Sequence, residues 1–307
     1  MRDVMVSETQ LAIKVDVDTR LGSGEGLLRL RDIFKARGIK TSFFLSLGPD
    51  NSGRALRRVF TKPGFLAKMI RTRAPSAYGW RTLLYGTLIP APLIGLGLAG
   101  PVRDLLDFGH EVGLHAWDHV TWHDYLWKMS RGAVQAEVRR GLKAFSALAG
   151  AGPQGFAAPA WRINLPSLAA LEKAGLVYMS ATRGTGPYWP SLFGHRFHLL
   201  EIPTTLPTAD EVLGRGRVGP DNLCDFLWER IMPPGLHVLT IHAEMEGRGL
   251  APAFENLLDR CLDNGVSFFR LIDVARMVLA RPGDLPVCEI IRKNVPGRAG
   301  RVSHQAP

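Results

Sequence analysis

Apolar residues in this chain follow two spacings that alternate along most of its length. Short runs rich in Val, Ile and Phe are typical of buried strands, and between them apolar residues recur every three or four positions, as in amphipathic helices. Strands are expected over 11–17, 40–47, 111–114, 155–157, 177–181, 198–203, 236–241 and 266–269. Helices are expected over 24–37, 101–108, 131–149, 165–174, 221–231, 253–262 and 271–279. This order predicts an α/β fold with a parallel, barrel-like sheet.

Polar residues with catalytic chemistry fall where the predicted strands end. Asp16 and Asp18 close the first strand, His115 follows the strand over 111–114, and His242 follows the strand over 236–241. In barrel-like α/β folds the carboxyl ends of the strands carry the active site. We therefore expect these four residues to meet at one end of the sheet.

The pair His115 and His119 suggests a metal. Histidines four residues apart lie one turn apart on the same face if the segment is helical. Asp16 and Asp18 alternate in a strand and so point to the same side. Two imidazoles and one carboxylate leave a coordination position open for water, as in catalytic zinc sites. The sequence thus predicts a metal-dependent hydrolase.

Composition is that of a globular protein. The 307 residues are 46% hydrophobic and 21% charged, which is enough apolar material for a large core and argues against global disorder. The three cysteines, Cys224, Cys261 and Cys288, form no CxxC pair, and the first residues contain no secretory apolar stretch. We expect a reduced, cytoplasmic location. One domain over 1–280 is expected, followed by an irregular basic tail over 281–307.

Basic residues are concentrated in one window. The net charge is +10, yet no Asp or Glu occurs between Asn51 and Arg103. Such an excess favours an anionic partner, either nucleic acid or an anionic membrane surface. The nine basic residues of this window are Arg54, Arg57, Arg58, Lys62, Lys68, Arg71, Arg73, Arg81 and Arg103.

The same window contains a basic and apolar insertion over about 54–100. Its second part, 82–100, carries no charge and is about as long as the roughly 20 residues of a membrane-spanning helix, but Pro90, Pro92 and the glycines that follow would interrupt one. An interfacial membrane element is the favoured interpretation, and packing against the chain's own domain is the alternative. Nucleic-acid binding is disfavoured because long aliphatic runs separate the bases. Aromatic residues that suit a lipid headgroup region are Phe65, Tyr78, Trp80 and Tyr85.

The order of these motifs resembles the polysaccharide deacetylase family, also called NodB-homology or carbohydrate esterase family 4. The paired aspartates, the His-x-x-x-His pair and Leu239-Thr-Ile-His242 carry the resemblance. It implies a distorted (β/α) barrel in which Asp18, His115 and His119 bind a divalent metal, zinc by default, with cobalt, manganese or nickel as alternatives. It also implies that Asp16 is the catalytic base and His242 the acid. Arg162 resembles the arginine that holds the base, and a surface arginine is the alternative.

A narrower resemblance extends over almost the whole chain. It includes 48–54, 76–80, 111–119, 202–208 and 240–244, and it points to the deformylases that act on 4-deoxy-4-formamido-L-arabinose-phosphoundecaprenol. The implied enzyme releases formate from this lipid-linked aminosugar at the anionic inner-membrane surface, in the lipid A modification that gives polymyxin resistance. Asn51, Arg54, Trp117 and Glu244 are candidate substrate or membrane contacts, although Trp117 suits packing equally well.

One position departs from the family pattern. Ala181 occupies a place where the family carries an Asp that orients the acid histidine. Loss of such a partner weakens general-acid catalysis, and Glu244, Glu246 or Asp210 are candidates to replace it. Two alternatives therefore stay open beside the deformylase: another sugar N-deacetylase, and a weakened enzyme that binds a polyprenyl-phosphate sugar.

Overall fold

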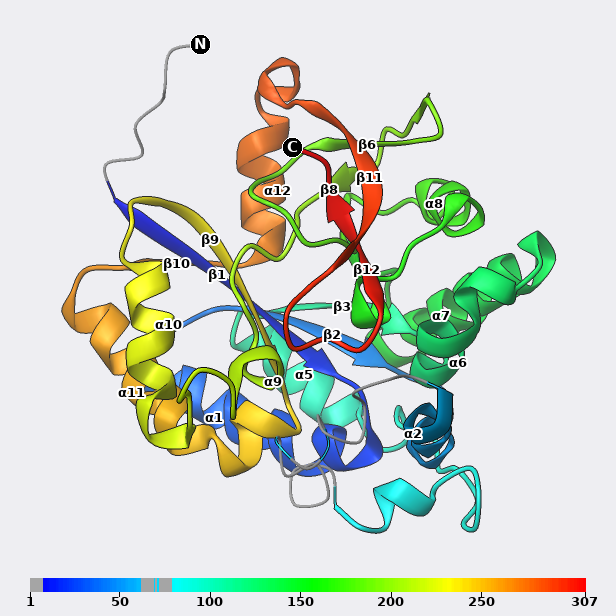
Figure 1. Cartoon of the computed structure of the whole chain (residues 1–307), viewed down its shortest axis with the longest axis horizontal. Coiled ribbons are helices and arrows are strands. Elements are labelled where there is room, and N and C mark those ends of the chain that lie inside the picture. Colours follow the sequence, from blue (N-terminus) through cyan, green and yellow to red (C-terminus); the bar gives the residue numbers. More distant parts are fainter. Residues whose placement is uncertain (1–7, 62–68, 70, 72–78) are drawn as a thin grey trace.

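A curled parallel sheet forms the centre of the computed structural model, which describes residues 8–61, 69, 71 and 79–307 (Figure 1). The pairing order is β10-β1-β2-β3-β4-β5-β8, and β9 pairs with the other edge of β1. The barrel-like α/β fold predicted from the sequence is confirmed. The strands are β1 (Thr9–Val17), β2 (Ser42–Ser46), β3 (Glu111–Ala116), β4 (Gly155–Ala157), β5 (Tyr178–Ser180), β8 (Leu200–Glu201), β9 (Gly235–His242) and β10 (Ser267–Phe269).

Strand β1 lies in the centre of this sheet and has strands paired to both of its edges. It pairs with β9 over Thr9 to Asp16, and its opposite edge is shared by β10 near the start and β2 near the end. Leu11, Ile13 and Val15 are buried, as expected for a parallel strand covered on both faces. The N–H groups of residues 205 and 206 both donate to the carbonyl of Val238. The segment after β8 therefore contacts β9 and links the two edges of the curled sheet.

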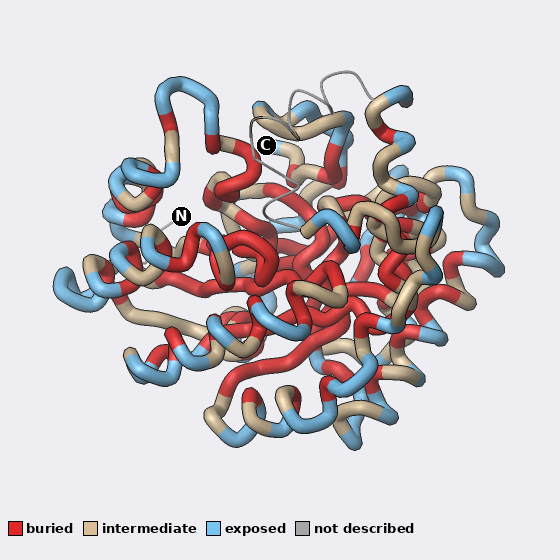
Figure 2. The backbone as a smooth tube through the Cα atoms, turned by 90° about the horizontal axis from the view of Figure 1, so that it is seen from below, coloured by how far each residue is buried: buried red, intermediate tan, exposed pale blue. Residues whose placement is uncertain are grey.

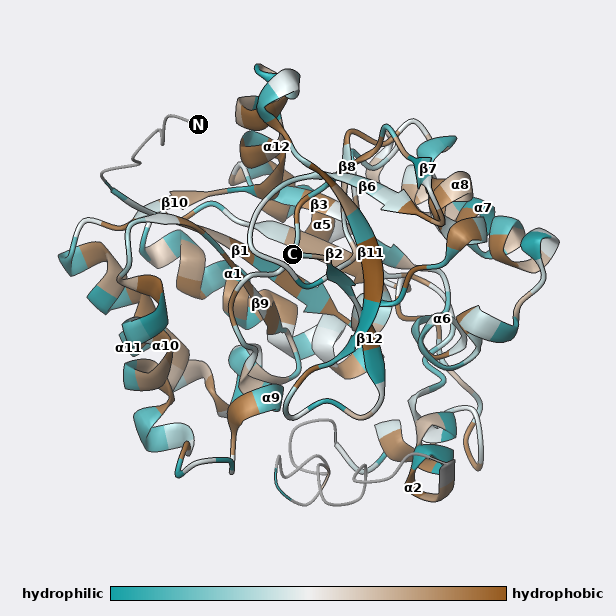
Figure 3. Ribbon diagram, turned by 45° about the horizontal axis from the view of Figure 1, so that its top comes forward, coloured by the Kyte–Doolittle hydropathy of each residue, from teal (hydrophilic) through white to brown (hydrophobic). Residues whose placement is uncertain are grey.

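Helices surround the sheet, with their buried positions facing it and their exposed positions facing outward (Figures 2 and 3). Helix α7 shows how closely local signals set their ends: Ser130 caps its first turn, and Gly150 ends it with a φ of 76° that favours glycine. The longer helices are α1 (Leu27–Ala36), α5 (Ala99–Asp107), α6 (His119–Tyr125), α7 (Arg131–Ala149), α8 (Leu165–Glu172), α10 (Leu223–Ile231), α11 (Ala251–Asp263) and α12 (Leu271–Leu279). Shorter helical turns are η1 (Gly22–Gly26), η4 (Leu126–Lys128), η5 (Pro159–Trp161), α9 (Ala209–Val212), η6 (Pro220–Asn222), η7 (Met245–Gly249) and η8 (Pro282–Asp284).

The expectation that His115 and His119 share a helical face is wrong. Strand β3 runs to Ala116, so His115 lies inside a strand, and helix α6 begins at His119. The turn between them still brings the two rings together, with centroids 5.4 Å apart and planes 22° from parallel. A strand-to-helix junction therefore forms the pair that the spacing alone suggested was helical.

The expected irregular tail is also wrong. Residues after 281 form an antiparallel hairpin of β11 and β12, and β11 pairs in parallel with β6. Val302 and Ser303 are buried, and the carbonyl of Ser303 accepts the N–H of Arg183. The hairpin is part of the domain, whose boundary therefore lies beyond 280. This second sheet consists of β6 (Trp189–Leu192), β7 (His195–Arg196), β11 (Val287–Asn294) and β12 (Arg301–Gln305).

Both ends of the insertion are bound to the domain. The N–H of Asp50 donates to the carbonyl of Pro92 at 2.8 Å, and that of Ile94 donates to the carbonyl of Gly48 at 2.9 Å. Ile94 and Leu98 are buried. These contacts agree with the expectation that the insertion packs on its own domain. Its described elements are η2 (Ser52–Arg57), α2 (Arg58–Thr61) and η3 (Thr82–Leu84).

The insertion also exposes apolar side chains. Phe60 is 91% exposed, Trp80 67% and Leu88 83%. Within the described ranges, no helix has the length and apolar character to cross a bilayer. Of the residues considered for membrane contact, Lys62, Phe65, Lys68, Arg73 and Tyr78 lie outside the described residues.

A buried histidine supports the packing of β2 on α1. The Nδ1 of His110 accepts the N–H of Thr41 at 3.1 Å, and its ring lies between those of Phe34 and Phe43, with centroids 5.9 and 5.3 Å away. Burial lowers the pKa of His110 to about 4. The folded protein therefore keeps this imidazole neutral over a pH range in which the unfolded chain protonates it.

We expect this histidine to make the protein less stable in mild acid. Between pH 6.5 and 4 the unfolded state binds more protons at His110, so its stabilising contribution is complete above pH 6.5 and disappears as the pH falls towards 4. The full difference corresponds to roughly 3 kcal/mol. His110→Asn retains a hydrogen-bond acceptor but does not titrate. In urea unfolding, the wild type should lose about 1–3 kcal/mol more than this variant between pH 7 and 4.5; parallel losses would contradict the assignment.

Candidate metal centre and active site

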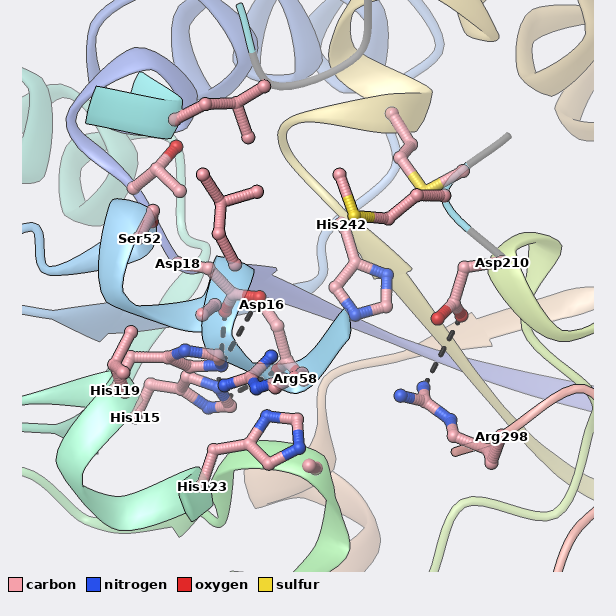
Figure 4. A pocket seen from close by; sticks show the side chains of 18 of the residues that line it. Asp16, Asp18, Ser52, Arg58, His115, His119, His123, Asp210, His242 and Arg298 are labelled. Atoms are coloured by element: carbon pink, nitrogen blue, oxygen red, sulfur yellow. Dashed lines mark hydrogen bonds and ion pairs between the residues drawn. The ribbon is translucent and has the colours of Figure 1, made fainter. Parts of the chain in front are cut away.

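Three side chains from two strands and one helix converge at the carboxyl end of the sheet (Figure 4). Asp18 follows β1, His115 lies in β3 and His119 begins α6. The Nε2 of His115 lies 3.2 Å from Asp18 Oδ1, and the Nε2 of His119 lies 3.4 Å from Asp18 Oδ2. One ligand atom from each residue lies within 4.8 Å of the other two. The structure thus brings together the three residues that the sequence singled out as metal ligands.

The chemistry of this cluster suits a divalent metal. Burial lowers the pKa of His119 to about 4, so its imidazole is neutral and has a lone pair to donate. Burial opposes ionisation of Asp18, but His119 and His115 outweigh it and hold its pKa well below the usual range. Asp18 Oδ1 is buried without a hydrogen-bond partner among the described residues. Two imidazoles and one carboxylate gathered around one point are a donor set that fits a divalent cation.

A network of hydrogen bonds positions His119. Asp118 caps α6 by accepting the N–H of Thr121 at 2.9 Å, and its other oxygen accepts the Nδ2 of Asn51 at 2.7 Å. The N–H of Asp118 donates to Glu137. Asn51 is buried here. Its amide therefore connects the start of the insertion to the turn that precedes His119. The sequence predicts a substrate or membrane contact for Asn51 instead.

Glu244 holds the loop that carries Asp18. Its Oε1 accepts the N–H of Asp18 at 3.0 Å and both the N–H and the hydroxyl of Thr19 at 2.8 Å. A Cβ at Gly22 would lie 2.0 Å from this oxygen, so the loop needs glycine there. Burial, together with the charge of Asp18, raises the pKa of Glu244 to about 8. Glu244 is fully buried, and the contacts that the structure shows for it are with the Asp18 loop, whereas the sequence predicts a substrate or membrane contact.

Asp16 and His242 are neighbours across the pairing of β1 with β9. They are partners in the register, so their side chains leave the same face of the sheet. Asp16 Oδ1 lies 3.7 Å from His115 Nδ1, and both Asp16 and His242 line the pocket that contains the metal cluster. In Figure 4 His242 faces the cluster from the opposite side. The arrangement places one carboxylate and one imidazole on the same cavity.

The pocket has walls from distant parts of the chain. Its cavity has a volume of about 150 Å³ and is open to solvent. The insertion contributes Ser52, Leu56 and Leu83, and the loop between β11 and β12 contributes Arg298. The insertion and the hairpin thus frame the metal cluster. Other lining residues are Thr19, Ala55, Arg58, Met69, Val120, His123, Ala160, Trp161, Asp210 and Met245.

The remaining predicted contacts lie elsewhere. Arg162 donates to the carbonyl of His123 and so does not hold Asp16 in the manner the resemblance implied. Trp117 packs against the hydrophobic core, in line with the alternative that this residue serves packing. Arg54 is exposed, and its Nε donates to the carbonyl of Gly86 at 3.0 Å.

Sequence reasoning missed Lys14, Trp161 and Glu201. Lys14 alternates with Asp16 and Asp18 along β1, a signal that was available in the printed sequence. The ring of Trp161 makes three cation–π contacts. Lys14 Nζ lies 5.4 Å from the ring centroid, and the guanidinium carbon of Arg298 lies 4.2 Å from it. Its φ of 49° is strained for a non-glycine residue. The position of Glu201, hydrogen-bonded to the N–H of Ala181, depends on strand pairing and could not be read locally.

Comparisons with known proteins point to one family. A family model described as polysaccharide deacetylase matches residues 22–179. A Shewanella sediminis protein named probable 4-deoxy-4-formamido-L-arabinose-phosphoundecaprenol deformylase ArnD is 37% identical over 97% of this chain and 95% of its own length. A Wigglesworthia glossinidia brevipalpis protein of the same name is 32% identical over 93% and 98%. A solved structure described as a polysaccharide deacetylase from Mycobacterium smegmatis, 19% identical, covers 94% of this chain and 96% of that chain with a TM-score of 0.60, which shows a shared fold.

Removal of Glu244 should weaken metal binding without removing a ligand. Glu244→Ala leaves two N–H groups and the Thr19 hydroxyl without their acceptor, so the loop loses its fixed position. We expect zinc affinity, measured by competition with a chromophoric chelator, to fall about 10- to 100-fold. Glu244→Gln keeps an oxygen acceptor and should stay within a few-fold of wild type. Equal zinc affinity in all three proteins would show that Glu244 does not organise the site.

Proposed function

This chain belongs to the polysaccharide deacetylase family, and on that basis we propose that it removes the formyl group from 4-deoxy-4-formamido-L-arabinose-phosphoundecaprenol. Family members are amide hydrolases that act on carbon–nitrogen bonds other than peptide bonds. The observation that carries the narrower proposal is the similarity to the two deformylases, which extends over the insertion as well as the metal cluster. The reaction would belong to the lipid A modification that the sequence resemblance implies.

The residues of the pocket suit hydrolysis of a formamide. Asp16 has one carboxylate oxygen without a hydrogen-bond partner among the described residues, so it can accept the proton of an attacking water. His242 can donate a proton to the amine nitrogen as the carbon–nitrogen bond breaks, which avoids release of an amide anion. The products are formate and the free aminosugar lipid.

A divalent metal held by Asp18, His115 and His119 would act as a Lewis acid that lowers the pKa of water and polarises the formyl oxygen. Zinc fits two imidazoles and one carboxylate, and cobalt, manganese and nickel accept the same donors. Glu244 and Asp118 would keep these ligands in place by the hydrogen bonds described above.

The insertion suits a substrate that stays in the membrane. Its exposed Phe60 and Trp80 lie within four residues of Leu56 and Leu83, which line the pocket. Exposed arginines accompany them, and each base near an anionic lipid surface contributes on the order of 1 kcal/mol of attraction. We infer that this part of the insertion contacts the inner membrane and lets the sugar headgroup enter the pocket while the lipid tail remains in the bilayer. The exposed bases are Arg54, Arg57, Arg81 and Arg103.

A weakened enzyme or lipid-sugar binder is the second candidate, and Ala181 favours it. In the described part of the chain, His242 Nδ1 has no hydrogen-bond partner. Glu246 accepts the backbone N–H of His242 at 2.8 Å, and burial raises the pKa of its carboxyl to about 7. Catalytic turnover, rather than binding, separates this candidate from the deformylase. Turnover of the formamido substrate but not of an acetamido analogue separates the deformylase from a generic sugar N-deacetylase.

The proposal is tested by formate release. The purified protein loaded with zinc should convert the formamido-arabinose lipid to the amino form, detected by mass spectrometry, and should leave an acetamido analogue unchanged. A chelator and His115→Ala should each lower the rate by at least about 100-fold. His195→Ala is the matched control, because His195 is exposed on β7. Full activity after chelation would rule out the metal, and no turnover of the lipid by zinc-loaded wild type would favour the binder.

Membrane contact is tested by sedimentation with liposomes. Replacing Phe60, Trp80 and Leu88 with Ser should release the protein from vesicles that contain anionic phospholipid, because apolar area and bases act together at the interface. The control variant replaces Phe193 and Met277, which are also exposed but lie outside the insertion. High salt should weaken binding of the wild type. Equal sedimentation of the two variants would contradict the assigned surface.

A further inference from the structure

Lys14 is a fully buried lysine next to the candidate base. It lies in β1 two residues before Asp16, so both side chains leave the same face of the strand. Its Nζ lies 3.6 Å from Asp16 Oδ2 and donates to the carbonyl of Ser180 at 3.4 Å. Among residues that parallel strands usually bury, a charged lysine is out of place and needs a reason.

A buried ammonium is stable only where other groups balance it. Burial lowers the pKa of Lys14, and the negative charges of Asp16 and Glu201 oppose that shift. Trp161 adds a ring face 5.4 Å from Nζ. A well-packed apolar residue at such a place is often as stabilising as a buried charge pair. Packing therefore does not explain why position 14 is charged.

Glu201 connects Lys14 to the strand that departs from the family pattern. Its carboxylate accepts the N–H of Ala181 at 2.8 Å and the N–H and hydroxyl of Thr182, each at 2.8 Å. These bonds fix the carboxylate at the end of β5, where Ala181 itself offers no polar side chain. Glu201 is completely buried, and burial raises its pKa to about 7, against the opposing effect of its hydrogen bonds and of Lys14. When ionised, its charge acts on Lys14 through a medium of low polarity.

We propose that Lys14, whose charge Glu201 helps to balance, is the positioning residue for Asp16, the task that the resemblance gave to Arg162. The two oxygens of Asp16 have different surroundings. Oδ2 faces Lys14, and Oδ1 has no hydrogen-bond partner among the described residues. Lys14 thus fixes the rotation of the carboxylate and leaves Oδ1 to accept a proton. Arg162 is directed to the carbonyl of His123 instead.

This inference rests on the proposed deformylase activity, and its test has two independent measurements. In Lys14→Met, kcat should fall about 10- to 100-fold while KM stays within about two-fold, since only the orientation of the base is lost. Zinc content should remain that of the wild type. Lys14→Arg should recover most of the lost kcat, which a purely space-filling role would not explain.

The second measurement is the crystal structure of the variant, which needs no turnover. The Asp16 carboxylate should occupy a different rotamer in Lys14→Met and the native one in Lys14→Arg. If Lys14→Met does not fold, the double variant Lys14→Met with Glu201→Gln removes the buried charges of both residues. It should fold, and its kcat should be lowered as expected for Lys14→Met. An inactive wild type would refute the proposed function alone. Native orientation of Asp16 in Lys14→Met, or wild-type kcat in Lys14→Met or in the double variant, would overturn the positioning role.

Discussion

The balance of buried charge at the end of β1 is the constraint on which the rest of this structure depends. Lys14 and Asp16 alternate along β1, Asp18 follows its last residue, and all three are buried, so water cannot compensate their charges. Each of these charges therefore needs an oppositely charged or hydrogen-bonding group inside the protein. Lys14 forms an ion pair with Asp16 and is balanced electrostatically by Glu201, and Asp18 contacts His115 and His119. The central position of β1, with strands on both edges, makes these meetings possible.

The partners of these charges come from places far apart in the chain, and this explains the architecture around the pocket. Glu244 from the end of β9 holds the Asp18 loop, and Asn51 from the start of the insertion holds the cap of α6. The insertion and the loop of the C-terminal hairpin both contribute to the pocket wall. Segments that looked peripheral in the sequence thus build the cavity in which the proposed chemistry takes place.

The same arrangement joins catalysis to location. Phe60 and Trp80 are exposed and lie within four residues of Leu56 and Leu83, which line the pocket, so the proposed membrane contact and the pocket wall are close neighbours along the insertion. A substrate with a sugar headgroup and a lipid tail would meet both parts at once. This link is a proposal, and it gives the insertion a role that neither packing nor charge explains separately.

The sequence by itself determined the α/β alternation, most helix ends and the convergence of Asp18, His115 and His119, because these depend on local periodicity, capping residues and strand-end positions. Helix α7 was predicted over the observed residues. Only the tertiary structure decided how His115 and His119 meet, because a strand-to-helix turn and a single helix have the same four-residue spacing. It also decided the hairpin of the tail, since its pairing with β6 joins residues about a hundred positions apart. For the same reason the contacts that the structure shows for Arg162 and Glu244 differ from the predicted ones: burial and strand register, rather than neighbours in sequence, determine what a charged side chain can reach.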